Sequence, residues 1–107
     1  MAIYSGQLID LVWRKGTVVP EYDPAKWRQD FAGAWMYYDA YGTVGEYGWE
    51  IDHIRPLSQG GEDSIINLIP IQWHNNMVKA NNYPKFKSAV TSHGEHNIEM
   101  ERSWEIQ

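Results

Sequence analysis

The sequence predicts an α+β fold for this chain of 107 residues. Two short apolar runs, at residues 49–53 and 68–71, are bounded by turn residues and have the length of strands. A helix is expected over residues 72–81, before Pro84 breaks the chain. Alternating residues on both sides of His93-Gly94 favour a C-terminal β-hairpin. Together these patterns predict a strand–loop–strand–helix core followed by a hairpin.

The segment that precedes this core is expected to be partly helical. Ser5 can cap a helix over residues 6–15 that ends at Gly16. Asp23 followed by Pro24 combines a capping carboxylate with proline at the first helical position, which predicts a second helix to about residue 30. A short strand is expected over residues 34–38, and the glycines that follow it favour turns.

Length and composition are those of one domain over residues 1–107, with a modest core. The chain has no cysteine, which excludes disulfides and cysteine-based zinc sites. The N-terminus lacks the basic and apolar regions of a secretory signal, and no apolar run is long enough to span a membrane. We therefore expect a cytoplasmic protein.

The net charge of −5 argues against simple electrostatic binding to nucleic acid. The charge is uneven, however: residues 64–94 contain no Asp or Glu, whereas Lys79, Lys85 and Lys87 all lie there. A basic face beside an acidic remainder and an ordinary solvated surface both remain open.

Five residues in and around the core could together hydrolyse a phosphodiester, which requires an activated water and charge neutralisation at the phosphate. Asp52 and His53 end the first apolar run, Asn67 precedes the second, and Asn76 and Lys79 are spaced i, i+3 on the expected helix. A neutral imidazole can accept a proton from water near pH 7, and an amide oxygen suits a hard cation.

These residues stand in a pattern that resembles the core of the HNH endonuclease family, the ββα-metal nucleases. The resemblance is specific over residues 47–79, within a core motif at 47–82, and is weaker over 27–42 and around the terminal hairpin. It consists of Asp52-His-Ile-x-Pro, Gly60-Gly61, Asn67-Leu and Trp73-x-x-Asn-x-x-Lys. The nine-residue spacing from Asn67 to Asn76 also fits the HNH domains of RNA-guided nucleases. The resemblance implies a ββα-metal core and an endonuclease that uses one divalent ion, Mg²⁺ or Mn²⁺, to cleave DNA.

The resemblance also implies roles for individual residues. Asp52 and Asn76 would hold the metal, His53 would activate water, Asn67 would fix the loop 54–66, and Lys79 would assist at the phosphate. The residues expected to contact nucleic acid are Arg55, Lys79, Lys85 and Lys87. His74 lies roughly 200° around the helix from Asn76 and is expected outside the site.

The chain departs from the zinc-stabilised branch of the family, which has a Cys-x-x-Cys pair where Gln72 and Asn75 stand here. We therefore expect no structural zinc, with aromatic packing in its place. Because no separate base-reading module is visible, we expect weak sequence specificity on DNA.

Two other interpretations remain. The acidic balance is compatible with an HNH scaffold reused for binding a protein partner, such as a phage-encoded inhibitor of a host factor. The chain could also be an RNase or a toxin domain. In each case the expected location is the cytoplasm of a bacterium or of a phage-infected host cell.

Overall fold

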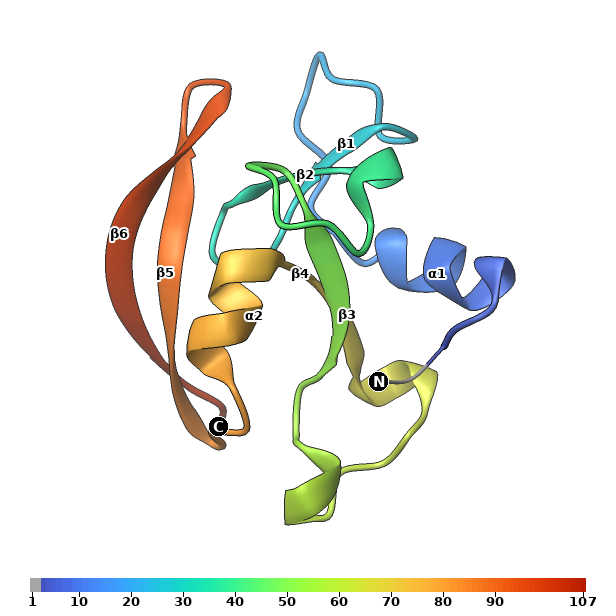
Figure 1. Ribbon diagram of the computed structural model, residues 1–107, viewed down its shortest axis with the longest axis vertical. Coiled ribbons are helices and arrows are strands. Elements are labelled where there is room, and N and C mark those ends of the chain that lie inside the picture. The colour runs from blue at the N-terminus through green and yellow to red at the C-terminus, as the bar shows by residue number, and fades with distance from the viewer. Residues whose placement is uncertain (1–2) are drawn as a thin grey trace.

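The computed structural model describes residues 3–107 and has a mixed α+β fold, as predicted (Figure 1). In this part of the chain there are two α-helices and three antiparallel strand pairs. The helices are α1 (Gly6–Trp13) and α2 (Trp73–Lys79). The pairs are β1 (Trp27–Gln29) with β2 (Trp35–Tyr37), β3 (Trp49–His53) with β4 (Leu68–Gln72), and β5 (Lys85–His93) with β6 (His96–Glu105).

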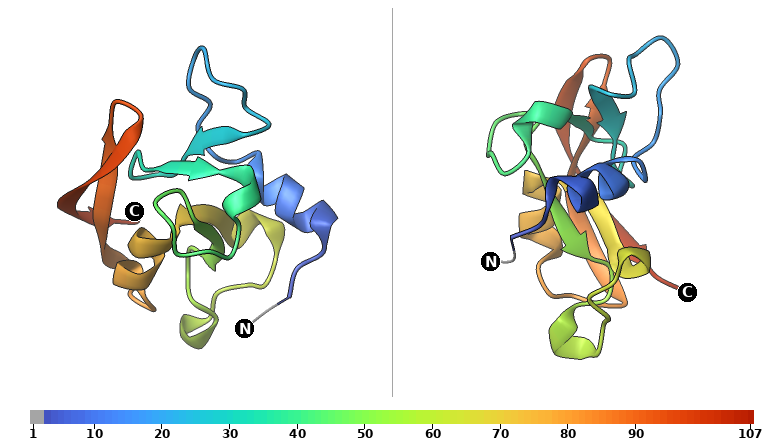
Figure 2. Two further views of the ribbon diagram at one scale, coloured as in Figure 1. Left: turned by 45° about the horizontal axis from the view of Figure 1, so that its top comes forward. Right: turned by 90° about the vertical axis from the view of Figure 1, so that its right-hand side faces the viewer.

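The β3–β4 pair occupies the middle of the molecule, with α2 on one side and α1 on the other (Figures 1 and 2). The β5–β6 hairpin packs on the outer side of α2 through β5, and β1–β2 lies across one end. Helix α2 therefore lies between the central strand pair and the hairpin.

The apolar core joins elements from both halves of the chain. Trp13 of α1, Met36 of β2 and Trp49 of β3 form one buried cluster, and the ring centroids of Trp13 and Trp49 are 5.0 Å apart. Tyr38 meets Trp13 edge to face, at 5.4 Å between centroids. Large aromatic side chains thus supply much of the buried area that a chain of this size needs.

The expected first helix forms, but the expected second helix does not. The Ser5 hydroxyl accepts a hydrogen bond from Leu8 N at 3.1 Å and caps α1, which ends at Trp13. The chain after Asp23 forms a single turn, in which the Asp23 carbonyl accepts hydrogen bonds from Lys26 N and Trp27 N. The backbone then becomes extended. The prediction of a helix to residue 30 was wrong, since β1 gains backbone pairing with β2 and packs Trp27 against other aromatic rings.

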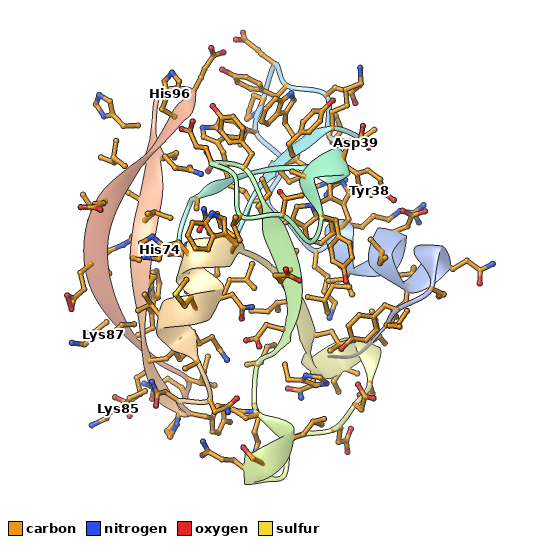
Figure 3. The ribbon with its side chains drawn as sticks, in the orientation of Figure 1. Tyr38, Asp39, His74, Lys85, Lys87 and His96 are labelled. Carbon is orange, nitrogen blue, oxygen red and sulfur yellow. The ribbon has the colours of Figure 1, made fainter. Side chains whose placement is uncertain are left out.

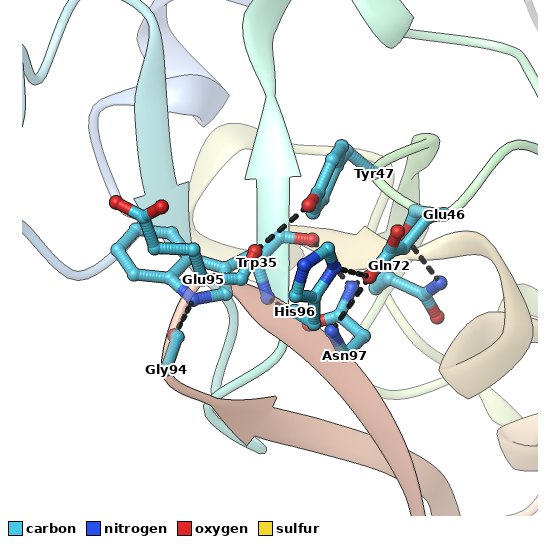
Figure 4. Close-up of polar contacts among 8 residues, drawn as sticks. All are labelled: Trp35, Glu46, Tyr47, Gln72, Gly94, Glu95, His96 and Asn97. Atoms are coloured by element: carbon cyan, nitrogen blue, oxygen red, sulfur yellow. Dashed lines mark hydrogen bonds and ion pairs between the residues drawn. The ribbon is translucent and has the colours of Figure 1, made fainter.

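The tip of the hairpin is attached to the loop before β3 by a set of polar contacts (Figure 4). The Asn97 amide donates to the Glu46 carbonyl at 2.9 Å, and the Glu46 carboxylate accepts from Asn97 N at 2.9 Å. His96 pairs with the same carboxylate at 3.2 Å, and Trp35 Nε1 donates to the Gly94 carbonyl. These contacts fix the hairpin relative to the central strands.

A buried carboxylate, Asp30, lies at the junction of β1, β2, β4 and α2. Its Oδ1 accepts from the backbone N–H groups of Ala32 and Ala34, and its Oδ2 accepts from Gln72 N and from Asn75 Nδ2, all at 2.9–3.0 Å. Burial raises the pKa of Asp30, and these four N–H donors oppose that rise. The carboxylate is therefore well supplied with partners inside the protein.

The buried amide of Asn75 extends this network into β5. Its Oδ1 accepts from Ala89 N and Val90 N at 2.8 Å, and its Nδ2 also donates to the Val90 carbonyl at 3.2 Å. The β5–β6 register shifts between Ser88 and Val90, which leaves two successive N–H groups for the same acceptor. We call Asp30, Asn75 and their partners the Asp30–Asn75 hub.

The hub includes Gln72 and Asn75, the positions at which the zinc-stabilised branch of the family that the sequence resembles has its Cys-x-x-Cys pair. The Gln72 side chain caps α2 by accepting from His74 N and Asn75 N, and Asn75 bonds as described above. At these two positions the chain has a polar network. No apolar pattern in the sequence marks the hub, so the sequence analysis did not predict it.

We predict that Asn75→Ala lowers the free energy of unfolding by about 3 kcal/mol or more, because it leaves several buried backbone groups without partners. Urea denaturation followed by circular dichroism measures this change. Asp39→Ala, which truncates an exposed polar side chain, should stay within about 0.5 kcal/mol of the wild type. Equal stability of the two variants would contradict the structural role of the hub.

Candidate functional site

The Asp-His pair lies at the end of β3, directly opposite the start of β4. The Cα partners are Asp52 with Ile69 and His53 with Leu68, and Ile54 N extends the pairing by donating to the Asn67 carbonyl at 2.8 Å. Because alternate residues of a regular strand face opposite sides, the two side chains separate. His53 and Ile51 line a surface groove, whereas Asp52 turns toward Lys79.

The groove brings together His53 from β3 and Asn76 from α2, two of the residues selected from the sequence. Its volume is about 610 Å³, and Tyr4 and Tyr41 also line it. Asp52 does not line the groove but lies near it: burial raises the pKa of Tyr4, and the charges of Asp63 and Asp52 raise it further. The structure thus brings the His53 imidazole and the Asn76 amide to one groove and leaves the Asp52 carboxylate outside its lining.

His53 has a carboxylate partner that the sequence analysis missed. Its Nε2 lies 2.9 Å from Oδ1 of Asp63, and its side chain is 17% exposed while that of Asp63 is 65% exposed. Asp63 lies in the long loop, four residues before Asn67. In the sequence, Asp63 is visible only as an acidic residue shortly after Gly60-Gly61. Because it lies ten residues from His53, the contact becomes apparent only in the folded loop.

Asn67 ties the two ends of that loop together. Its Oδ1 accepts from Arg55 N at 3.0 Å, and its Nδ2 donates to the carbonyls of Arg55 and Glu62 at 3.0 and 2.7 Å. Gly61 fits tightly beneath it, because a Cβ at this position would lie 1.8 Å from the Arg55 carbonyl oxygen. The loop that carries Asp63 is therefore held in one shape beside His53.

Lys79 is fully buried, which corrects the expectation that it contacts phosphate. Its Nζ lies 2.7 Å from Asp52 Oδ2, in an ion pair that is not aligned as a hydrogen bond. It donates to the His53 carbonyl at 3.0 Å and lies 5.4 Å from the centroid of the Phe86 ring. Lys79 thus links α2 to the end of β3 from inside the molecule.

The other candidate contacts to nucleic acid lie apart from the groove. Exposed Arg55 donates to the Gln59 carbonyl at 2.7 Å and lies over the ring of Tyr83. Lys85 and Lys87 are on β5, at the outer side of the hairpin (Figure 3), where both line a different pocket and Lys87 pairs with Glu101. The structure therefore does not bring these cations next to His53.

His74 lies outside the groove, on the side of α2 that faces the hairpin (Figure 3). Its ring stacks on Trp73 with 5.1 Å between centroids and 17° between planes. Asn76, two residues further on, faces the groove instead. This division agrees with the helical geometry expected from the sequence.

A comparison with protein-family models gives one match, to the family described as HNH endonuclease, over residues 44–85. Residues 44–85 therefore match the HNH endonuclease family, and this match suggests nuclease activity in general. Enzymes of this family typically use a divalent metal ion. Comparisons with curated proteins and with solved structures gave no match.

Two further findings concern the described residues only. Residues 3–107 contain no cluster of three or more His, Cys, Asp or Glu side chains placed to hold a metal ion. Neither α1 nor α2 has the length and apolar character needed to cross a membrane.

We predict that Lys79→Met lowers the free energy of unfolding by about 3 kcal/mol, because it leaves the Asp52 carboxylate without its buried counter-ion. Urea denaturation provides the measurement. Lys87→Met removes an exposed ion pair and should change stability by less than about 0.5 kcal/mol. The double variant Lys79→Met, Asp52→Asn should recover part of the loss. If the two single variants are equally stable, Lys79 does not have this role.

Proposed function

We propose that this protein is a metal-dependent endonuclease that hydrolyses phosphodiester bonds in DNA. In this proposal β3, β4 and α2 form the ββα-metal core, at residues 47–82, of one HNH domain that spans residues 1–107. One observation carries the proposal: His53, paired with Asp63, shares a groove with Asn76 inside the segment that matches the HNH endonuclease family.

The Asp63 contact supports Nδ1 of His53 as the proposed base. A carboxylate accepts hydrogen bonds, so the neutral imidazole would carry its proton on Nε2 and leave Nδ1 free. We propose that Nδ1 takes the proton from the attacking water. The Asp63 carboxylate then stabilises the imidazolium that forms, as a carboxylate does in other His-centred sites.

The donor set near the groove fits a hard divalent cation. Within residues 3–107 the Asn76 side chain makes no hydrogen bond, so its amide oxygen is available as a ligand. The Asp52 side chain is 20% exposed although its Oδ2 is buried against Lys79. We propose that Asp52 and Asn76 would hold Mg²⁺ or Mn²⁺, ions that prefer oxygen ligands and retain several waters. When bound, the ion supplies charge neutralisation at the scissile phosphate.

Lys79 has a positioning role in this proposal. Its ammonium binds both the Asp52 carboxylate and the His53 carbonyl, the two groups that set where β3 ends. Asn67 fixes the loop that presents Asp63. His53 and Asp52 are therefore oriented by internal contacts of the protein, which is how a reactive geometry is maintained without substrate.

We predict that the purified protein cleaves plasmid DNA with Mg²⁺ or Mn²⁺, that EDTA stops cleavage, and that His53→Ala lowers the rate at least 100-fold because the base is lost. Gel analysis of time courses measures the rates. His74→Ala is the matched control and should retain wild-type activity. Absence of cleavage of DNA would refute the proposal; cleavage of RNA alone would reassign the substrate, and a stable complex with one host protein without cleavage would favour a binding role.

We predict that Asp63→Asn lowers kcat about 10- to 100-fold, because the amide stabilises the imidazolium less well and permits the wrong ring orientation. The free energy of unfolding should change little, since the Asp63 side chain is 65% exposed. Glu62→Gln, a neighbouring exposed change in the same loop, should leave kcat unchanged. Equal kcat values for Asp63→Asn and the wild type would mean that Asp63 does not act through His53.

A further inference from the structure

The groove beside His53 has an apolar and aromatic lining that the hydrolytic chemistry does not require. Tyr4, Tyr41 and Trp73 contribute rings, and Val44 and Met77 are 75% and 61% exposed beside them. Exposed apolar side chains gathered around one groove mark a binding surface. The groove therefore offers contacts to something other than a phosphate.

Along residues 3–107, the groove lacks the cationic side chains with which proteins follow a phosphate backbone. Within the described residues no Lys or Arg lines it, and the charged carboxyl side chain that does so is Glu50. Several cations are used internally instead: Lys15 donates to the Leu68 carbonyl, and Arg28 donates to the carbonyls of Pro24 and Gly16. Proteins that bind duplex DNA by its backbone need several such cations on the surface.

An unpaired nucleotide fits this combination better than a duplex does. Proteins that bind single strands stack bases on aromatic side chains, a contact that needs no particular sequence. A carboxylate repels phosphate but can accept a hydrogen bond from the amino group of a base, which makes Glu50 compatible with a base edge. In a duplex, by contrast, the faces of the bases are covered by their neighbours.

We propose that the groove binds an unpaired stretch of DNA, with a base held against Tyr4 or Trp73 while the adjoining phosphate reaches His53 and Asn76. This inference rests on the proposed nuclease function and specifies its substrate: single-stranded or locally unpaired DNA is preferred to intact duplex. The preference originates in the aromatic wall, so it affects binding as well as cleavage.

Binding can be measured without cleavage, using fluorescence anisotropy of a labelled 12-nucleotide strand and of the matching duplex in EDTA. We expect the single strand to bind the wild type at least about 10-fold more tightly than the duplex. Tyr4→Leu and Trp73→Leu, which keep apolar bulk but remove the ring face, should each weaken single-strand binding about 10-fold. Tyr83→Leu changes a ring outside the groove and should leave it unchanged.

A second pair of variants keeps the test independent of ring packing. Met77→Glu places a negative charge in the groove and should weaken single-strand binding, whereas Met100→Glu makes the same change at a pocket on the far side of α2. Equal binding of strand and duplex, or equal effects of these two variants, would overturn the inference. Rapid cleavage of duplex and single strand alike would also overturn it while leaving the nuclease proposal intact. Tight, groove-dependent strand binding without cleavage in Mg²⁺ or Mn²⁺ would refute the nuclease instead.

Discussion

The contact between the Asp30 carboxylate and the Asn75 amide connects three parts of the chain that are distant in sequence. The Asp30 carboxylate accepts hydrogen bonds from the backbone N–H groups of Ala32, Ala34 and Gln72. The Asn75 amide oxygen accepts from two N–H groups at the bulge in β5. Most of these N–H groups are buried, and a buried N–H without an acceptor costs about 1–3 kcal/mol. This pair of side chains joins α2 to both the central strands and the hairpin, and so helps to set the position of Asn76.

Helix α2 combines structural and reactive roles within seven residues. Asn75 and Lys79, spaced i, i+4, point inward and bind the hub and the end of β3. Asn76 faces the groove, and His74 faces the hairpin. A helix so short gains little from its own hydrogen bonds, so its stability comes from these inward contacts. The placement of Asn76 on α2 is therefore a consequence of the packing of its neighbours.

The sequence predicted β3, β4, α2 and the hairpin to within a few residues because apolar runs, prolines and glycines mark their limits. It failed at Asp23, where the local capping pattern was genuine but strand pairing of Trp27 prevailed. The sequence analysis assigned Lys79 to the phosphate because of its i, i+3 spacing from Asn76. The same position on α2 also allows the contact with Asp52 that the structure shows. Asp63 and the hub were missed because polar contacts between distant residues leave no periodic trace in a sequence.

The Asp30–Asn75 hub includes residues outside the segment that matches the HNH family. The structure of that segment therefore depends on the rest of the chain. That segment, residues 44–85, contains every side chain proposed for catalysis. It begins after Asp30 and stops before Ala89 and Val90, the groups that complete the network around Asn75. A fragment that contains only this segment, whether alone or inserted into another protein, would keep the reactive side chains. It would lose the hydrogen bonds of the hub that hold those side chains in position.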